Sequence, residues 1–323
     1  MRGGAHLPSR QRGIALLVAI VMFAIATTVA AAITYDKAMA ARRAAATFTL
    51  EQALQAGMAA EALAAIALED DARHTQTVLS REWAQPLPPT EIEGTAVVVA
   101  GQIEDLSGRF NLNSVVAWDG NQNALVRDQR QVEVFENLLR ALDIDPSYAE
   151  LLVDWLDSDT TPQLSGGGED TLYLTQTPPY RPPNTLITHP SELLALPKFG
   201  AENYAKIAPY VTALPWYVVV NACTASGLVL DMNNNDGQDQ WRAAPLDAMR
   251  KNGCGTDKST IRASFSDPNK WGPADAHYVE RSDWFRLRTN VRIGTAEFVL
   301  YSVLYREPTG NRVRTVQRSF GSE

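Results

Sequence analysis

Hydrophobic and polar positions predict a very long helix at the start of the chain. Residues Ile14 to Ile33 form an apolar run of twenty residues whose only polar members are Thr27 and Thr28. A helix of that length spans about 30 Å, which matches the hydrocarbon core of a bilayer. Residues 34–69 contain no proline, a single glycine and many alanines, which are the best helix formers. The two segments together predict one helix of more than 50 residues, with its first third in a membrane and the rest outside.

Strand patterns lie on both sides of a helical block. Residues 95–113 are rich in β-branched side chains, and polar side chains at every second position from Arg286 to Arg292 alternate with Leu287 and Val291. Such alternation is typical of an antiparallel sheet with one solvated face. Residues 130–159 and 189–215 instead carry apolar side chains at helical spacing. The proline-rich stretch QPLPPTEIEG, residues 85–94, lies between the long helix and the first strand segment and is expected to be a connection.

The simplest topology for this order is an insertion. We predict an α+β fold in which a long N-terminal helix and an antiparallel sheet are built from both ends of the chain, with a large all-α domain inserted between them. The predicted parts are a leader, 1–13; the membrane part of the helix, 14–33; the first part of the helix-plus-sheet domain, 34–111; the inserted helical domain, 112–280; and the C-terminal strands, 281–323.

Basic residues set the expected orientation in the membrane. Arg2, Arg10 and Arg12 precede the apolar run. By the positive-inside rule the N-terminus is expected in the cytoplasm and the body on the opposite side, which is the periplasm in a Gram-negative cell. A secretory signal has a shorter apolar region of about 7–15 residues. Cleavage near Ala30–Ala32, as in such a signal, nevertheless stays open.

The leader resembles those of type IV prepilins and type II secretion pseudopilins, because it is basic and ends in Gly13 directly before the apolar Ile14. The resemblance implies that a prepilin peptidase cuts between Gly13 and Ile14, that the new N-terminus is methylated, and that the helix stays in the inner membrane. Most members carry a glutamate at the fifth mature position, where this chain has Val18. A carboxylate at bilayer depth is costly unless paired, so Val18 suits a subunit with no neighbour above it. The alternative is an ordinary, uncut signal anchor.

Motifs in the middle of the chain resemble general secretion pathway protein K, the largest minor pseudopilin of the type II secretion system. They are, in order, DLSGRFNLNSV, VDWLDSD, GGEDTLYL, PPYRPPNTLITHPSELLAL and LPKFGAENYAKIAPYVTALP, all between residues 105 and 215. The resemblance implies a pilin-like fold with an inserted domain and a complex with the I and J types at the pseudopilus tip, with the H type below. It also implies a structural function, in which the subunit caps or initiates a fibre that moves folded exoproteins. The contact surface would be the helix between residues 34 and 69.

Five carboxylates form a candidate metal site around a glycine-rich loop. The segment DWLDSDTTPQLSGGGED places them close together and has no His or Cys nearby, which favours a hard, oxygen-binding ion. Family members bind calcium in this region, so the resemblance implies calcium here. One alternative is a solvated acidic loop. For Asp154, another alternative is that its side chain faces the interior of its helix. The five residues are Asp154, Asp157, Asp159, Glu169 and Asp170.

A second acidic stretch carries a weaker expectation. DMNNNDGQDQW resembles the start of an EF-hand loop, but its glycine falls one place late and its glutamate is missing. A looser oxygen site therefore competes with a plain polar turn. The ligands of such a site would be Asp231, Asn233, Asn235 and Asp239.

The chain contains two cysteines, Cys223 and Cys254. They are expected to form a disulfide with each other if the body is exported, and to remain thiols in a reducing compartment. A disulfide that closes a loop of this length is worth roughly 3–4 kcal/mol in the chain-entropy model.

Charge and motifs argue against other functions. The net charge of −8 makes nucleic acid an unlikely partner, because phosphate binding needs concentrated Lys and Arg. We find no nucleotide-binding loop, no serine-hydrolase elbow and no zinc-protease pair, and therefore assign no catalytic residue. The competing hypothesis is a membrane-anchored periplasmic hydrolase or binding protein that uses the acidic cluster as an open metal site. The favoured hypothesis is a non-enzymatic tip pseudopilin.

Overall fold

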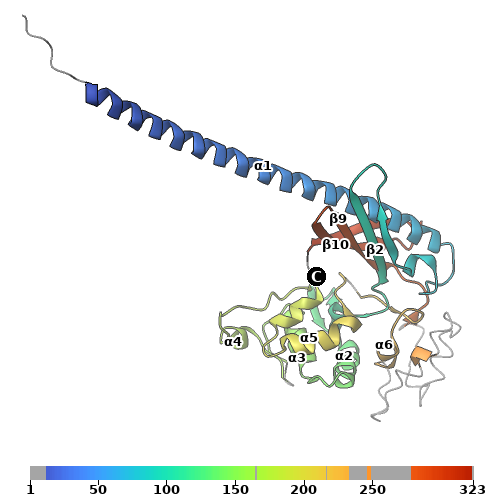
Figure 1. Ribbon diagram of the computed structural model, residues 1–323. Coiled ribbons are helices and arrows are strands. Elements are labelled where there is room, and N and C mark those ends of the chain that lie inside the picture. Colours follow the sequence, from blue (N-terminus) through green and yellow to red (C-terminus); the bar gives the residue numbers. More distant parts are fainter. Residues whose placement is uncertain (1–11, 164–165, 216, 233–245, 249–277, 322–323) are drawn as a thin grey trace, which may run out of the picture. The chain divides into compact units, whose positions relative to one another are not determined.

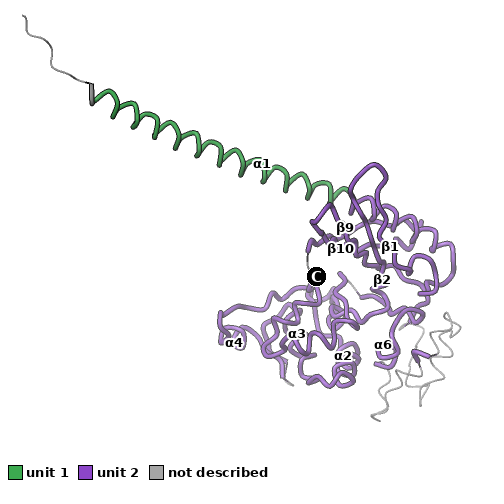
Figure 2. Tube along the Cα trace, in the orientation of Figure 1, with its two compact units in different colours: residues 1–55 green, residues 56–323 purple. Residues whose placement is uncertain are grey.

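The computed structural model describes residues 12–163, 166–215, 217–232, 246–248 and 278–321 (Figure 1). The chain divides into two compact units, residues 1–55 and residues 56–323 (Figure 2). Helix α1 (Arg12–Asp71) begins in the first unit and ends in the second. Its 60 residues confirm the predicted single helix of more than 50 residues.

The first part of α1 is long and apolar enough to cross a membrane. Its most apolar window of 18 residues has a mean hydropathy of 2.7, and no residue of that window is buried within the chain. The polar side chains of this part bond to their own helix: the hydroxyls of Thr27 and Thr28 donate to the carbonyls of Phe23 and Ala24 at 3.0 and 2.9 Å. In a bilayer core, such bonds satisfy hydroxyls that would otherwise lack a partner.

The second unit contains a five-stranded antiparallel sheet in the order β1-β2-β9-β10-β11. Strand β2 precedes the insert in the chain and β9 follows it, and the two pair from Val97 opposite Ile293 to Asp105 opposite Phe285. The sheet is therefore built from both ends of the chain, as predicted. The strands are β1 (Leu87–Glu91), β2 (Val97–Asp105), β9 (Trp284–Ile293), β10 (Ala296–Arg306) and β11 (Val313–Phe320).

Strand β1 corrects one prediction. We expected residues 85–94 to be a connection, but Leu87–Glu91 pairs with β2 as the first edge strand. Pro88 and Pro89 are tolerated because an edge strand leaves one side of its backbone unpaired. The pairing register also shifts between Leu87 and Thr90, around these two prolines.

The end of α1 packs on one face of the sheet through small side chains. Ala56, Ala60 and Ala64 recur every four residues and are at most 8% exposed. A side chain at Gly57 would place its Cβ 2.7 Å from the Cδ2 atom of Leu300 in β10, so the glycine permits this close approach. The alternation of β9 is confirmed, since Leu287 and Val291 are buried, whereas Arg288 and Asn290 between them are exposed.

The insert contains helices, as predicted, but the prediction of an all-α domain is wrong, because it also contains three short strand pairs: β3 with β6, β4 with β5 and β7 with β8. Its core includes the stacked rings of Phe110 and Phe135, whose centroids are 5.3 Å apart. Its helices are α2 (Gln129–Ala141), α3 (Tyr148–Leu156), α4 (Asp170–Tyr173), α5 (Gly200–Ile207) and α6 (Gly227–Asp231). Its strands are β3 (Phe110–Asn111), β4 (Val116–Asp119), β5 (Ala124–Arg127), β6 (Val211–Thr212), β7 (Val220–Asn221) and β8 (Tyr278–Val279). The 3-10 turns of unit 2 are Glu82–Ala84, Leu112–Val115, Pro190–Ala195 and Ala208–Tyr210.

Two asparagines of the FNLN motif join distant loops of the insert. The side-chain oxygen of Asn113 accepts a hydrogen bond from the Ile187 amide at 3.0 Å, and its amide group donates to the carbonyl oxygens of Ile187 and Leu214 at 2.9 and 2.8 Å. Asn111 accepts from the Leu214 amide at 2.9 Å. Both asparagines are buried, and their side chains extend the β3–β6 pairing to Leu214 and connect this segment to the loop at Ile187.

A buried arginine joins the sheet to the end of the long helix. Arg306 is the last residue of β10 and is fully buried. Its Nη1 atom lies 3.2 Å from the Oδ2 atom of Asp71 and 3.1 Å from the carbonyl oxygen of Leu68, and its Nη2 atom donates to the Thr77 hydroxyl at 2.8 Å. A buried charge with this many partners is strongly destabilising to remove, because the partner charge stays buried.

We predict that Arg306→Ala lowers the free energy of unfolding by about 3–5 kcal/mol, because buried Asp71 would keep only its longer contact with Arg81, at 3.5 Å. Arg292→Ala, at an exposed position of β9, is the matched control and should change stability by less than about 0.5 kcal/mol. Denaturant unfolding of the full chain in detergent measures both. Equal effects for the two variants would contradict a structural role for the buried arginine.

Candidate metal centre

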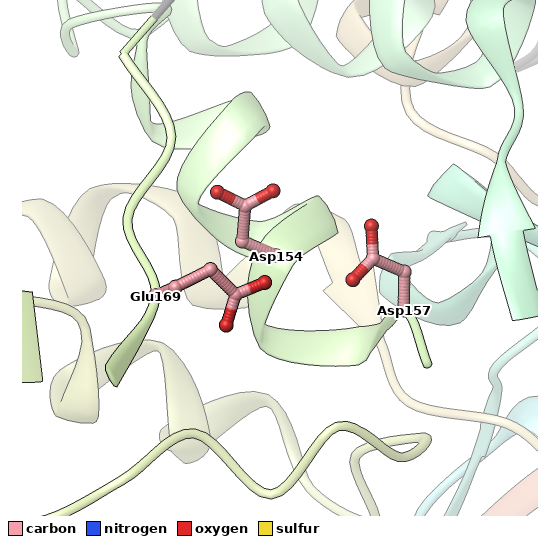
Figure 3. Close-up of side chains that lie close together, drawn as sticks. All are labelled: Asp154, Asp157 and Glu169. Atoms are coloured by element: carbon pink, nitrogen blue, oxygen red, sulfur yellow. The ribbon is translucent and has the colours of Figure 1, made fainter. Parts of the chain in front are cut away.

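Three carboxylates converge where helix α3 ends. Asp154 lies in the last turn of α3, Asp157 directly follows the helix, and Glu169 precedes α4. Figure 3 shows the Asp154 and Asp157 side chains on α3 and at its end, with Glu169 approaching from the segment alongside. The apolar residues of α3 place it in the core of the insert, and this fixes the position of its last turn.

The three carboxylates are close together and buried. One oxygen from each lies within 4.8 Å of one oxygen from each of the others. Asp154, Asp157 and Glu169 are 0%, 1% and 4% exposed. Buried carboxylates are found where they are paired, protonated or bound to a cation, and within the described chain no Lys or Arg makes an ion pair with any of the three.

Few hydrogen bonds satisfy this cluster. The backbone amide of Gln163 donates to Asp154 Oδ2 at 3.1 Å, and the Gln163 side-chain amide lies 3.5 Å from Asp157 Oδ2. Among the residues that the structure describes, the Oδ1 atom of Asp157 and both oxygens of Glu169 have no hydrogen-bond partner although they are buried. Unsatisfied buried oxygens of this kind call for a proton or a cation. The donor set, three hard carboxylates, fits calcium or magnesium rather than zinc.

The glycine run lets the loop approach these carboxylates. A Cβ atom at Gly167 would collide with the Oδ2 atom of Asp154 and lie 2.6 Å from the Gln163 amide nitrogen. A Cβ at Gly168 would collide with the Leu172 side chain. The backbone of Gly168 also donates a hydrogen bond to Asp154. Glycine is therefore needed here for close approach, and it exposes the carboxylates to backbone groups rather than to water.

The electrostatics disfavour three ionised carboxylates. Burial raises the pKa of Asp154 to about 6, against the opposing effect of the Gln163 and Gly168 backbone amides. Burial raises the pKa of Asp157 to about 7, with further increases from the charges of Asp159 and Asp154. Burial and the neighbouring acids, Asp154 first, raise the pKa of Glu169 to about 7. A divalent cation would reverse these shifts, because it favours the charged form of every ligand.

Aromatic residues lie beside the three carboxylates. The sequence analysis did not predict that they belong to this site. Trp155, Tyr173 and Tyr180 form a cluster in which the Trp155 and Tyr173 ring centroids are 5.2 Å apart. Burial raises the pKa of Tyr173, and the charges of Tyr180, Asp154 and Glu169 add to this increase, so the hydroxyl stays protonated. The regular spacing of Trp155 with the leucines of α3 is typical of ordinary core, and only the tertiary contact reveals its position.

The structure separates the remaining predicted ligands from this cluster. Asp159 is exposed after the end of α3 and its Oδ1 atom accepts from the Thr161 amide at 2.7 Å. Asp170 begins α4 and lies 3.2 Å from Arg181. Neither is brought into the group of three, whereas Asp154, for which a place inside its helix was the alternative, is part of it. The expectation of five ligands is thus reduced to three carboxylates, with the other two acids nearby.

The weaker oxygen site is described only in part. Asp231 ends α6 and is buried. Asn233, Asn235 and Asp239 lie outside the described residues, so this site stays a prediction.

The predicted disulfide between Cys223 and Cys254 is also described only in part. Cys223 is buried and disulfide-bonded, so the expectation of an oxidised cysteine is met at this position. Cys254 lies outside the described residues. The pairing of Cys223 with Cys254 therefore stays a prediction, and the alternative of two unpaired thiols is wrong for Cys223.

Comparison with known proteins identifies the family. The model of the family described as type II secretion system (T2SS), protein K matches residues 108–216, which include all three clustered carboxylates. Type II secretion system protein K of Pseudomonas aeruginosa is 30% identical over 322 residues, covering 96% of this chain and 93% of the relative. The chain belongs to the type II secretion system protein K family. The resemblance seen in the motifs is confirmed, and with it the assignment as a minor pseudopilin.

Other members agree along the whole length. Type II secretion system protein K of Pectobacterium carotovorum subsp. carotovorum is 29% identical over 324 residues, or 97% of each chain. One chain of the solved GspK–GspI–GspJ complex from the type 2 secretion system of enterotoxigenic Escherichia coli matches with a TM-score of 0.67 and 21% identity, covering 87% of this chain and 100% of that chain. The structural match confirms the predicted fold class, a pilin-like helix and sheet with an insert. The names of these relatives are those of secretion-system components.

The raised pKa values predict how stability depends on pH when divalent ions are removed. The folded state then binds more protons than the unfolded state between about pH 4 and pH 7, so the stability supplied by the protonated cluster is complete below about pH 4 and is lost as the pH rises through about 7. Glu169→Gln removes one of these groups. In chelator, the variant should melt higher than the unmodified chain near pH 8 and close to it near pH 4.5. A difference in melting temperature that does not change with pH would contradict the raised pKa values.

Proposed function

We propose that this chain is the minor pseudopilin at the tip of the type II secretion pseudopilus, where it caps or initiates the fibre and supports export of folded exoproteins. The first part of α1 would anchor it in the inner membrane, with the N-terminus in the cytoplasm and the body in the periplasm. Family membership supports the assignment, as does the likeness to a chain of a solved GspK–GspI–GspJ complex. The proposed partners are accordingly the I and J types, with the H type below.

The observation that carries the tip position is Val18 within an uninterrupted helix. Helix α1 runs from Arg12 to Asp71 without a break, so the proposed membrane segment and the proposed contact segment belong to the same helix. The fifth residue after Gly13 is apolar Val18, where most pseudopilins have a glutamate for the N-terminal amine of a neighbour. A subunit at the top of a fibre has no such neighbour, and it avoids the cost of an unpaired carboxylate in the bilayer.

We further propose that Asp154, Asp157 and Glu169 hold a structural calcium ion. The support is their burial, their mutual distances and the lack of hydrogen bonds to Glu169 among the described residues. Calcium takes six to eight oxygens, and backbone carbonyls of the glycine-rich loop can add to those of the carboxylates. The ion would tie the end of α3 to the loop before α4.

A structural ion is favoured over a catalytic one. A catalytic site keeps an open coordination position and a base that reaches substrate, whereas all three carboxylates here are at most 4% exposed. The relatives are named as secretion-system proteins rather than enzymes, which also supports a function without catalysis. The membrane-anchored hydrolase therefore has no observation in its favour.

Processing tests the assignment as a pseudopilin. Protein recovered from its own host's membranes should begin at Ile14, with a methylated amine, because the proposed cut follows Gly13. Intact mass and N-terminal sequencing measure this. Gly13→Ala should remain uncut and stop exoprotein secretion, while Ala32→Leu, which alters the competing signal-peptidase site, should be processed normally. A chain that begins after Ala32 would contradict the proposal.

Calcium binding tests the metal centre separately. Asp157→Asn and Glu169→Gln should each raise the calcium dissociation constant at least about tenfold, since each removes a charged ligand. Asp159→Asn, an exposed neighbour that makes no part of the cluster, is the matched control and should change it by less than about threefold. Calorimetry on the full chain measures all three, and terbium emission sensitised by Trp155 gives a second readout. Equal losses for Asp159→Asn and Glu169→Gln would place the ion elsewhere.

A further inference from the structure

The sheet ends in a strand whose outer edge is open. Strand β11 pairs with β10, and in the described part of the chain no other strand pairs with it. It has eight residues and no proline, whereas the opposite edge strand, β1, has five residues and two prolines. Prolines and short length are devices that protect a sheet edge from pairing with another chain. The β1 edge has both of these devices, and the β11 edge has neither.

The hydrogen-bond pattern shows which backbone groups face outward. Neighbouring residues of an antiparallel strand alternate between facing their partner and facing away. The Gly321 amide donates to Val299 of β10 at 3.0 Å, so the backbone groups of Phe320 and Arg318 point away from β10. Beyond the register shift opposite Val303 and Leu304, the same pattern turns Thr315 outward. These three residues offer amide and carbonyl groups to an added strand.

The outward pattern is supported at the start of the strand. The Val313 amide, which the alternation also turns away from β10, donates to the Oε1 atom of Glu69 at 2.9 Å. A side chain thus occupies the open edge at this one position. Outside the β10–β11 ladder, no described backbone group bonds to the amides of Arg318 or Phe320. The usable edge therefore runs from Thr315 to Phe320.

The side chains along this edge define the chemistry of its partner. Phe320 and Val316 are 47% and 44% exposed, so the strand presents two large apolar side chains to solvent. Arg314 is 58% exposed and its contact with Glu307 is 3.7 Å long, while the charge of Arg318 is matched by Glu61 at 2.7 Å. An exposed and long ion pair such as Arg314–Glu307 contributes little stability. Arg314, together with the exposed Arg312, can therefore attract a carboxylate.

We propose that the open edge of β11 binds an extended, acidic segment of another polypeptide by strand addition. Main-chain hydrogen bonds to Thr315, Arg318 and Phe320 would supply affinity, and side-chain chemistry would supply selectivity. If the added strand is antiparallel, its first residues lie beside Phe320 and are apolar, and its last residues lie beside Arg314 and are acidic. The proposal depends neither on the tip position nor on bound calcium.

A second copy of the chain fits this edge poorly. Antiparallel self-pairing centred on Val316 would place Arg314 of each copy opposite Arg318 of the other, whose carboxylate partner Glu61 is already engaged, so Arg314 would gain no carboxylate of its own. Pairing with β1 of another copy would meet Pro88 and Pro89, which cannot donate hydrogen bonds. The occupant is therefore a different, acidic strand.

The test uses the full chain in detergent and the fluorescent peptide acetyl-Thr-Val-Thr-Val-Thr-Glu-Thr-Glu as probe, with a Lys-for-Glu peptide as its control. Fluorescence anisotropy should show binding of the acidic peptide and at least about tenfold weaker binding of the basic one. Hydrogen exchange of segment 313–321 should slow when the acidic peptide binds. Arg314→Glu should reverse the preference between the two peptides.

Two variants at one position separate backbone from side-chain effects. Phe320→Pro removes an outward amide without breaking the ladder to β10, and Phe320→Ala keeps that amide. The Pro variant should bind at least about fivefold more weakly than the Ala variant, which is the expected effect of one lost hydrogen bond. Equal binding by these variants, equal binding of both peptides, or no binding would overturn the proposal. Protection of segment 313–321 that rises with protein concentration in the absence of peptide would assign the edge to a second copy, and would also overturn it.

Discussion

The ladder between β2 and β9 is the interaction on which the rest of unit 2 depends. It joins the strand before the insert to the strand after it, from Val97 opposite Ile293 to Asp105 opposite Phe285. At its end, buried Asp105 accepts hydrogen bonds from Ser282 and from the Thr224 hydroxyl at 2.5 Å. Thr224 belongs to the insert and Ser282 lies between the insert and β9. Asp105, the last residue of β2, therefore also fixes the position at which the chain returns from the insert to the sheet.

Two buried polar groups of unit 2 have different origins of stability. Arg306 is matched by Asp71 and by three neutral acceptors, the carbonyls of Leu68 and Ser282 and the Thr77 hydroxyl, so its charge is compensated within the chain. The cluster of Asp154, Asp157 and Glu169 has no such cation among the described residues, and burial raises all three pKa values. The first group stabilises the fold by itself, whereas the second requires protons or a metal ion.

The sequence predicted those features that depend on local pattern. The long helix followed from an unbroken run of helix formers, and β9 followed from the alternation of Leu287 and Val291 with polar residues. In both segments, neighbouring residues favour the same secondary structure. The pattern missed β1, since Pro88 and Pro89 suit an edge strand only after another strand has formed beside them. It also predicted five metal ligands where three converge. The Asp159 side chain accepts a hydrogen bond from Thr161, and the Asp170 side chain pairs with Arg181. Sequence spacing does not predict these tertiary contacts.

The C-terminal end of α1 has a face that the sheet does not cover. Ala60, Ala64 and Leu68 are buried against the sheet side, but Leu63 and Ile66 on the other side are each 63% exposed. A helix that is apolar on both faces is stable in water only if another element covers the second face. A solitary periplasmic enzyme gains nothing from this arrangement. In a fibre, the helix of a neighbouring subunit can cover this second face.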